Sequence, residues 1–237
     1  MNLALSRDLI LYKKNIRLTP RQRNLLIGTI LGDGNLRFVR KNREASFIVD
    51  HSITQKDYVF WKYEIMREFV LTEPKELVRI YHKDKSRLLR SSRFSTISHS
   101  EFTSLYELFY RNKIKIIPVN IGEILKSPLS LAIWFMDDGN KNHQSVFLNT
   151  QQFTLGEQEI LRSCLRDNFG LESTINKHWL YKEKQLYRIR LNTVSTKKLY
   201  DLIYDLVLPS MRYKFPSFPV TTLSVVNSDR IAISESL

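Results

Sequence analysis

Cysteine, glycine and long apolar runs are all scarce in this chain of 237 residues. Its single cysteine, Cys164, excludes a disulfide framework and a zinc site built on cysteines, and it fits a reducing compartment. No apolar run approaches the roughly 20 residues that cross a bilayer. The N-terminus lacks the apolar core and the cleavage pattern of a signal peptide. These absences argue against a secreted protein and against one that spans a membrane.

Acidic residues are also in deficit, with 24 Asp and Glu against 37 Lys and Arg, which gives a net charge of +13. The hydrophobic share of 43% is that of a folded protein, so the charge excess does not indicate general disorder. An excess of this size needs a polyanionic partner, and nucleic acid is the first candidate.

The order of predicted elements occurs twice along the chain. In the first half a helix that follows Thr19-Pro20 ends at Gly32-Asp33-Gly34. In the second half a helix that begins at Pro128 ends at Asp137-Asp138-Gly139. Each helix is followed by two strands, a helix, a hairpin and a last helix. The sequence therefore predicts an α+β fold of two pseudo-symmetric αββαββα units, over residues 18–126 and 127–216, with an N-terminal extension (1–17) and a C-terminal tail (217–237).

The ends of these two helices carry the most specific signal in the sequence. Residues 26–34 (LIGTILGDG) and 131–139 (LAIWFMDDG) resemble the two LAGLIDADG motifs of single-chain homing endonucleases. The resemblance covers roughly residues 18–216. It implies a saddle of antiparallel β-sheets with the two motif helices paired at its centre, so that Asp33 and Asp138 meet there. It also implies a monomer that makes a metal-dependent double-strand break in a long, asymmetric DNA target.

The second motif departs from the family pattern at two positions. Ile133 replaces the motif glycine, and Asp137 replaces the small residue before the acid. Ile133 puts the close approach of the helices in question, and Asp137 competes with Asp138 for the ligand role. We choose Asp138, because it aligns with the acid of the first motif. The glycine after each acid, Gly34 or Gly139, is expected to take the turn conformation in which the chain leaves the helix.

The resemblance assigns a divalent-metal site to the ends of the motif helices. Asp33 and Asp138 would bind Mg²⁺ through their carboxylates, and Gly32 and Asp137 through their backbone carbonyls. A carboxylate at a helix C-terminus adds to the negative field there, and two such groups side by side repel each other unless a cation lies between them. Mn²⁺ is expected to substitute for Mg²⁺, and Ca²⁺ to bind without supporting cleavage.

Two lysines, one in each half, match the family's active-site lysines. Lys115 and Lys214 each lie shortly before a proline. Each is expected to orient water or to neutralise developing charge. Polar residues after each motif helix would complete the sites, although ordinary strand or capping roles explain them equally well. These residues are Asn149 and Gln151 in the second half and Ser52 or Gln55 in the first.

Basic residues recur at alternate positions of the predicted hairpins, which hold few acids. Arg188 and Arg190 flank Ile189, so the two guanidiniums share one face of a strand. A β-ribbon fits the major groove, where arginine makes bidentate contacts to guanine. A solvated sheet face is the alternative, but such faces usually mix charges of both signs. The predicted DNA-binding residues are Arg37, Arg40, Lys41, Arg43, Arg79, Lys83, Lys85, Arg87, Arg90, Arg93, Lys177, Lys182, Lys184, Arg188 and Arg190.

The leading hypothesis is a homing endonuclease that hydrolyses one phosphodiester on each strand of double-stranded DNA. One alternative is a maturase that binds its intron RNA with the same fold and helps it to splice. Another is a relative that binds DNA without cutting it. The five histidines show no metal-ligand spacing, so we expect structural or phosphate-contact roles for them. The host compartment, an organelle (mitochondrion or chloroplast) or the prokaryotic cytoplasm, stays open.

Overall fold

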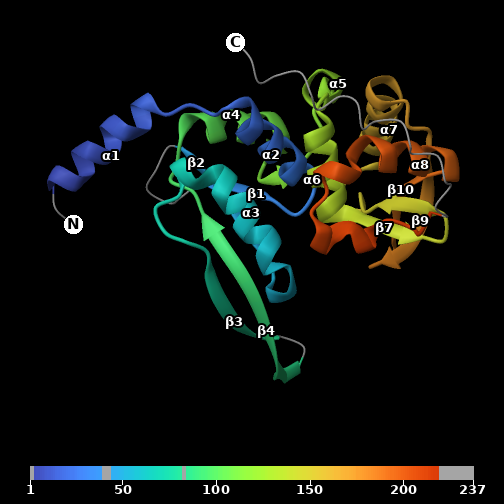
Figure 1. Ribbon diagram of the computed structural model, residues 1–237, viewed down its shortest axis with the longest axis horizontal. Coiled ribbons are helices and arrows are strands. Elements are labelled where there is room, and N and C mark those ends of the chain that lie inside the picture. The colour runs from blue at the N-terminus through green and yellow to red at the C-terminus, as the bar shows by residue number, and fades with distance from the viewer. Residues whose placement is uncertain (1–2, 39–43, 82–83, 219–237) are drawn as a thin grey trace, which may run out of the picture.

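The computed structural model describes residues 3–38, 44–81 and 84–218 (Figure 1). The first unit consists of α2 (Pro20–Leu31), β1 (Asn35–Phe38), β2 (Ala45–Ser52), α3 (Lys56–Met66), β3 (Lys75–Tyr81), β4 (Asp84–Ser95) and α4 (Ser100–Phe109). The second consists of α6 (Pro128–Asp138), β7 (Gly139–Asn142), β8 (Ser145–Leu148), α7 (Leu155–Phe169), β9 (Ser173–Tyr181), β10 (Lys184–Leu191) and α8 (Thr193–Ile203). The chain is therefore an α+β fold in which the order αββαββα occurs twice, as the sequence predicts.

The two units also share their sheet topology. The strand orders are β1-β2-β4-β3 and β7-β8-β10-β9, with antiparallel pairing throughout. Asn35 pairs with Ile48 in the first sheet, and Asn140 pairs with Phe147 in the second. In each unit, therefore, the residue two positions after the motif acid pairs with the second strand of its sheet. Figure 1 shows the β3–β4 hairpin projecting beyond the helices.

Further elements join the units or extend from them. Helix α1 (Leu3–Asn15), which the sequence pattern did not predict, extends away from the body in Figure 1. The small hairpin of β5 (Tyr110–Arg111) and β6 (Ile114–Lys115) and the short helix α5 (Ile121–Ile124) lead from the first unit to the second. A 3₁₀ helix, η4 (Pro209–Lys214), follows the second unit. Among the described helices, none is long and apolar enough to cross a bilayer.

The two motif helices, α2 and α6, begin in the same way and form the centre of the core. Thr19 caps α2 through a capping box with Gln22, Ser127 caps α6, and a proline opens each helix. Both helices are buried over nearly two turns, at residues 25–31 and 130–137. Because they are buried on all sides, they pack against each other as well as against their own sheets.

The motif helices approach each other closely because one of them presents glycines. A Cβ atom added at Gly28 would lie 2.4 Å from the carbonyl oxygen of Ser130 and 2.8 Å from the Cβ atom of Ile133. A Cβ atom at Gly32 would lie 2.4 Å from that of Asp137. The missing glycine of the second motif therefore does not prevent close packing, since Gly28 makes room for the larger Ile133.

The glycines after the two acids are needed for space and not for a turn conformation. Neither Gly34 nor Gly139 has a positive φ, so the expected turn conformation is wrong at both positions. Instead, a Cβ atom at Gly34 would lie 2.5 Å from Cγ2 of Thr29, and one at Gly139 would lie 2.3 Å from the ring of Phe135. Each of these glycines thus packs on the helix that the chain has just left.

Candidate active site and nucleic-acid interface

The two motif helices end side by side, and both acids open into one cleft. Asp33 follows α2, and Asp138 is the last residue of α6. Both line a cleft of about 540 Å³ together with Lys115, Asn149 and Gln151. The sequence predicts this meeting of the two acids, and the packing of the glycines against α6 is its physical cause.

Asp138 is the more deeply buried of the two acids. Its burial and then the charge of Asp33 raise the pKa of its carboxyl well above the usual range. Its Oδ2 atom is buried and has no hydrogen-bond partner among the described residues. A buried carboxylate oxygen without a partner is costly, so this atom favours a protonated acid or a bound cation.

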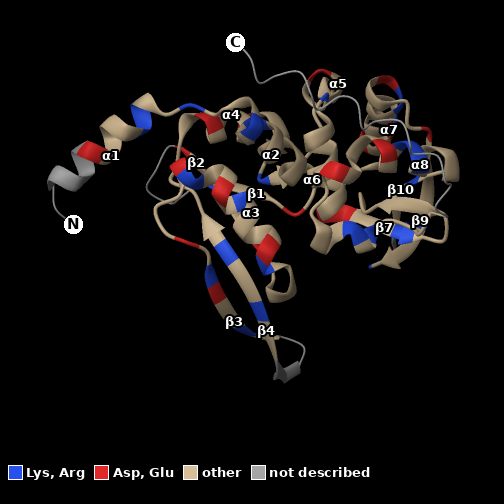
Figure 2. Cartoon of the chain, in the orientation of Figure 1, with Lys and Arg blue, Asp and Glu red and all other residues tan. Residues whose placement is uncertain are grey.

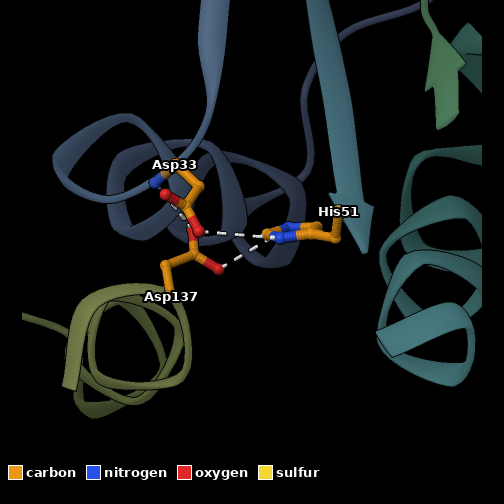
Figure 3. A group of neighbouring side chains, drawn as sticks. All are labelled: Asp33, His51 and Asp137. Atoms are coloured by element: carbon orange, nitrogen blue, oxygen red, sulfur yellow. Dashed lines mark hydrogen bonds and ion pairs between the residues drawn. The ribbon is translucent and has the colours of Figure 1, made fainter. Parts of the chain in front are cut away.

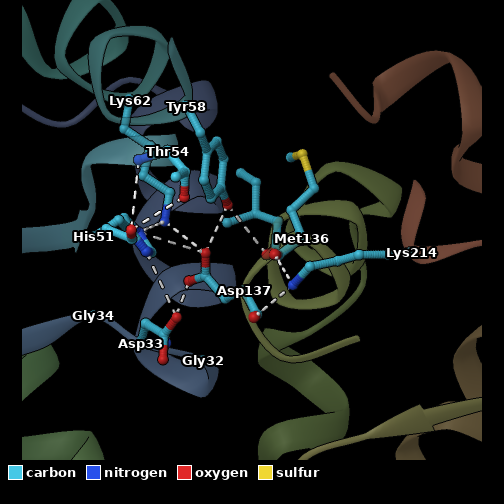
Figure 4. Close-up of polar contacts among 12 residues, drawn as sticks. Gly32, Asp33, Gly34, His51, Thr54, Tyr58, Lys62, Met136, Asp137 and Lys214 are labelled. Atoms are coloured by element: carbon cyan, nitrogen blue, oxygen red, sulfur yellow. Dashed lines mark hydrogen bonds and ion pairs between the residues drawn. The ribbon is translucent and has the colours of Figure 1, made fainter. Parts of the chain in front are cut away.

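Two lysines reach the ends of the motif helices from opposite halves. The Nζ atom of Lys115 donates to the carbonyl oxygens of Gly32 (2.8 Å) and Gly34 (2.9 Å). The Nζ atom of Lys214 donates to the carbonyl oxygens of Asp137 (2.8 Å) and Met136 (Figure 4). These carbonyls carry the partial negative charge of a helix C-terminus. Burial lowers the pKa of both ammonium groups, and the nearby carboxylates oppose that shift.

Asp33 has a half-exposed side chain and a buried histidine beside it. The Nδ1 atom of His51 lies 3.6 Å from Oδ2 of Asp33 (Figure 3). Burial, followed by the charge of Lys62, lowers the pKa of His51 to about 4, so the ring is neutral near pH 7. Partial burial and the charge of Asp137 raise the pKa of the Asp33 carboxyl.

The carboxylate of Asp137 bonds to residues of the first unit. Its Oδ1 atom accepts hydrogen bonds from the Tyr58 hydroxyl (2.7 Å) and from Nζ of Lys62 (2.7 Å). Its Oδ2 atom accepts the backbone N–H of Asp33 at 3.3 Å (Figure 4). These partners occupy Asp137, which supports Asp138 as the free acid of the second motif. Oxygen or nitrogen atoms of Asp33, His51 and Asp137 lie within 4.8 Å of one another, but a cation there would compete with Lys62.

The polar residues proposed to complete the cleft are placed differently in the two halves. Asn149 and Gln151 line it, and Nε2 of Gln151 donates to Oδ1 of Asn149 at 3.3 Å. In the first half, the Ser52 hydroxyl instead accepts from the N–H of Thr54 at the exposed end of β2. The polar residue that lies beside Asp33 in the first half is His51. The signal for it was alternation, because His51 follows the buried Phe47 and Val49 on one face of β2.

A model of the LAGLIDADG DNA endonuclease family matches residues 23–199, a span that includes both motifs. The chain belongs to this family. A "Probable intron-encoded endonuclease 1" of Wickerhamomyces canadensis is 30% identical over 215 residues, which cover 86% of this chain and 87% of that protein. A "Cytochrome b mRNA maturase bI2" of Debaryomyces hansenii is 27% identical over 197 residues, which cover 82% and 73%.

A solved structure of a LAGLIDADG protein agrees with this assignment over most of its length. The homing endonuclease I-WcaI bound to its DNA recognition sequence superposes with a TM-score of 0.80 at 29% identity. The match covers 92% of this chain and 95% of that one. The two-unit architecture described above is therefore the fold of a LAGLIDADG endonuclease.

In this LAGLIDADG chain the second sheet presents arginines on the face opposite its core. Ile189 and Leu191 of β10 are buried, and Arg188 and Arg190 alternate with them. The guanidinium of Arg188 lies 3.6 Å from the centre of the Phe147 ring, and Nε of Arg190 donates to the Ser145 hydroxyl at 3.1 Å. These contacts fix both guanidiniums on one face of the sheet.

In the first sheet, acids accompany the arginines more closely than the sequence suggests. Arg79 and Arg93 both contact the carboxylate of Asp50, at 2.5 Å and 3.9 Å. Arg90 pairs with Glu76 at 3.2 Å, on the opposite face of β4 from Arg93. The expectation that the hairpins are nearly free of acids is therefore wrong for this half. Figure 2 shows blue bands on both β3 and β4 and a red band on β3.

The remaining predicted DNA-binding residues divide into two groups. Arg37, Lys177 and Lys182 are exposed, on β1, on β9 and at the β9–β10 turn. The others lie outside the described residues or have side chains that are not described. These are Arg40, Lys41, Arg43, Lys83, Lys85, Arg87 and Lys184.

Proposed function

We propose that this protein is a homing endonuclease that makes a double-strand break in a long, asymmetric DNA target. The observation that carries the proposal is the meeting of Asp33 and Asp138, one from each motif helix, at a single cleft. Since one chain supplies both acids, we propose that it acts as a monomer. Its halves, residues 18–126 and 127–216, would each serve one DNA strand.

The donor set of the cleft fits a hard divalent cation. The carboxylates of Asp33 and Asp138 and the carbonyls of Gly32 and Asp137 offer only oxygen, which Mg²⁺ and Mn²⁺ prefer. The buried Oδ2 atom of Asp138 lacks a partner among the described residues, and a cation would satisfy it. A bound cation would stabilise the charge that develops on the phosphodiester and on the leaving oxygen. We propose Mg²⁺ as the natural ion, Mn²⁺ as a substitute and Ca²⁺ as an ion that binds without supporting cleavage.

The chain's own residues position the reactants. Lys115 and Lys214 hold the helix-terminal carbonyls and place an ammonium group at each side of the acids. We propose that these ammonium groups orient water and offset charge on the phosphate. The linked side chains of Asn149 and Gln151 would orient water on the Lys115 side of the cleft.

The outer faces of the two sheets are proposed to read the DNA. Arg188 and Arg190 are held on one face of the second sheet, and Arg79 and Arg93 lie on the matching face of the first. Basic side chains on a β-ribbon contact phosphates and base edges in the major groove. The exposed Arg37 extends this surface on β1, and Lys182 lies at the β9–β10 turn. Lys177 pairs with Tyr187 and therefore lies on the other face of the second sheet from Arg188.

The test is a cleavage assay on DNA that carries the uninterrupted insertion site, made by joining the sequences that flank the coding interval. We expect double-strand breaks with Mg²⁺ and none with EDTA. Binding without cutting in Mg²⁺ or Mn²⁺ would identify a DNA-binding relative instead, and would contradict the proposal.

An intron maturase is the second candidate, because one similar protein is named a cytochrome b mRNA maturase. Selective binding of intron RNA over other RNA of equal length would support this activity. The genomic interval that encodes the chain would also decide whether the compartment is a mitochondrion, a chloroplast or a prokaryotic cytoplasm.

A further inference from the structure

The two motif acids are held by unlike surroundings, although the halves share one topology. Asp33 has its backbone N–H and its side chain next to a buried polar cluster, which we define as Asp137, Lys62, Tyr58 and His51. Asp138 has no comparable cluster: its buried Oδ2 atom lacks a hydrogen-bond partner among the described residues.

The cluster lies on α3, on β2 and on the opposite motif helix. The side chains of Lys62 and Asp137 are both fully buried, and their charged atoms are 2.7 Å apart. Nζ of Lys62 also lies 3.2 Å from Nε2 of His51 and 4.2 Å from the centre of the Tyr58 ring. The Tyr58 hydroxyl contacts Asp137 at 2.7 Å and the Ile133 carbonyl at 3.3 Å. The carboxylate of Asp137 is thereby fixed on one side by two donors.

The other oxygen of that carboxylate accepts the N–H of Asp33 at 3.3 Å. This bond crosses from α6 to the residue that follows α2, so it links the second motif to the peptide that carries the first acid. His51 completes a closed path, because its Nδ1 atom lies 3.6 Å from the Asp33 carboxylate and its Nε2 atom lies beside Lys62 (Figure 4).

The positions that correspond to Lys62 and Asp137 in the repeated order of elements hold uncharged residues. Lys62 stands seven residues beyond the N-cap of α3, Gln55, and Leu161 stands seven residues beyond the N-cap of α7, Thr154. Both Lys62 and Leu161 are fully buried. The motif residue that corresponds to Asp137 is Gly32. A buried ion pair is therefore present in only one of two equivalent places, where an apolar pair would cost less free energy.

We propose that Asp137, held by Lys62 and Tyr58, is a positioning residue for Asp33, and that it acts selectively on cleavage of one DNA strand. The proposal rests on the endonuclease function proposed above. Asp137 would act through its side chain on the Asp33 peptide, in addition to the role of its backbone carbonyl. The two halves are then unequal in chemistry.

Two double variants of equal shape separate positioning from mere stability. Lys62→Met with Asp137→Asn removes the ion pair and keeps an oxygen that can accept the Asp33 N–H, while the new amide group donates to Tyr58. Lys62→Met with Asp137→Leu removes the ion pair and the acceptor together. Leucine and asparagine are both close in shape to aspartate, so unfolding in urea should show both variants folded.

The readout is the rate of cleavage of each strand, followed with a label on either 5′ end under single-turnover conditions in Mg²⁺. The variant with Asp137→Asn should cut both strands at a ratio close to that of the wild type. The variant with Asp137→Leu should cut one strand roughly tenfold to a hundredfold more slowly than the other, so that nicked DNA accumulates. Tyr58→Phe, which removes one hydroxyl, should shift the strand ratio in the same direction by a smaller factor.

The outcomes separate the two proposals. If the wild type cuts neither strand, the endonuclease function itself is wrong. If the wild type cuts and the Asp137→Leu variant slows both strands equally, or cuts like the Asp137→Asn variant, then Asp137 is structural only and the positioning role is refuted. Should the Asp137→Leu variant be unfolded, Tyr58→Phe decides by the same ratio, and an unchanged ratio refutes the proposal.

Discussion

Gly28→Ala tests whether close packing of the motif helices creates the active site. The added Cβ atom would lie 2.4 Å from the Ser130 carbonyl oxygen and 2.8 Å from the Cβ atom of Ile133. An ordinary contact is at least 3.4 Å, so the helices would have to separate by about 1 Å. Overpacking of this kind costs typically ~1–3 kcal/mol. Because Asp33 lies five residues beyond Gly28 and lines the same cleft as Asp138, a shift of that size should also slow cleavage by about 10²-fold.

The control is Gly156→Ala in α7, where the added Cβ atom meets nothing within 4 Å. Both changes gain helix propensity, of up to ~1 kcal/mol. Their difference in unfolding free energy, measured in urea, therefore isolates the steric cost, and it should be about 1–3 kcal/mol with Gly28→Ala the less stable. Equal stability of the two variants, with equal cleavage rates, would refute the claim that glycine at position 28 brings the acids together.

Three further predictions concern the charges. The pKa of Asp138 is raised in the folded protein, so the unfolded chain releases this proton first and the wild type loses stability as the pH rises above 3.8. Asp138→Asn should therefore become more stable relative to the wild type as the pH rises above 3.8 in EDTA, and a difference in melting temperature that does not change with pH would contradict this. Asp50→Asn frees two guanidiniums and should steepen the slope of log Kd against log salt by about 0.9 per phosphate gained, whereas the exposed Asp201→Asn should leave it unchanged. Lys115→Met should lower the single-turnover cleavage rate by about 10²-fold with little change in DNA affinity; an unchanged rate would remove Lys115 from the site.

Periodicity and the two motifs predict most of the fold. The helix of each motif begins at a capped proline and ends at or just before the motif acid, and the alternation of short strands and helices gives the repeated unit. Helix α1 was missed, because its apolar residues Ile10, Leu11 and Tyr12 are exposed and form no buried stripe.

The candidate site was predictable as far as the motifs and the family resemblance reach, which includes Lys115 and Lys214. Asp33 and Asp138 follow from the pattern, but the cluster of Tyr58, Lys62 and His51 depends on how α3 packs against the opposite unit. From the sequence, Lys62, one turn from Tyr58, is expected to be a solvated side chain. Its burial depends on its ion pair with Asp137, which lies on the motif helix of the second unit. The pairing of Asp50 with arginines from another hairpin is non-local in the same way.

The central claim is that acids from two motif helices form one metal-dependent centre. Its most direct test is double-strand cleavage of the insertion-site DNA in Mg²⁺ by Asp33→Asn and by Asp138→Asn, with Asp201→Asn as the control. Each motif variant should bind the DNA with nearly unchanged affinity and should make no double-strand breaks, while the control cuts normally. Normal cleavage by either motif variant would contradict the account.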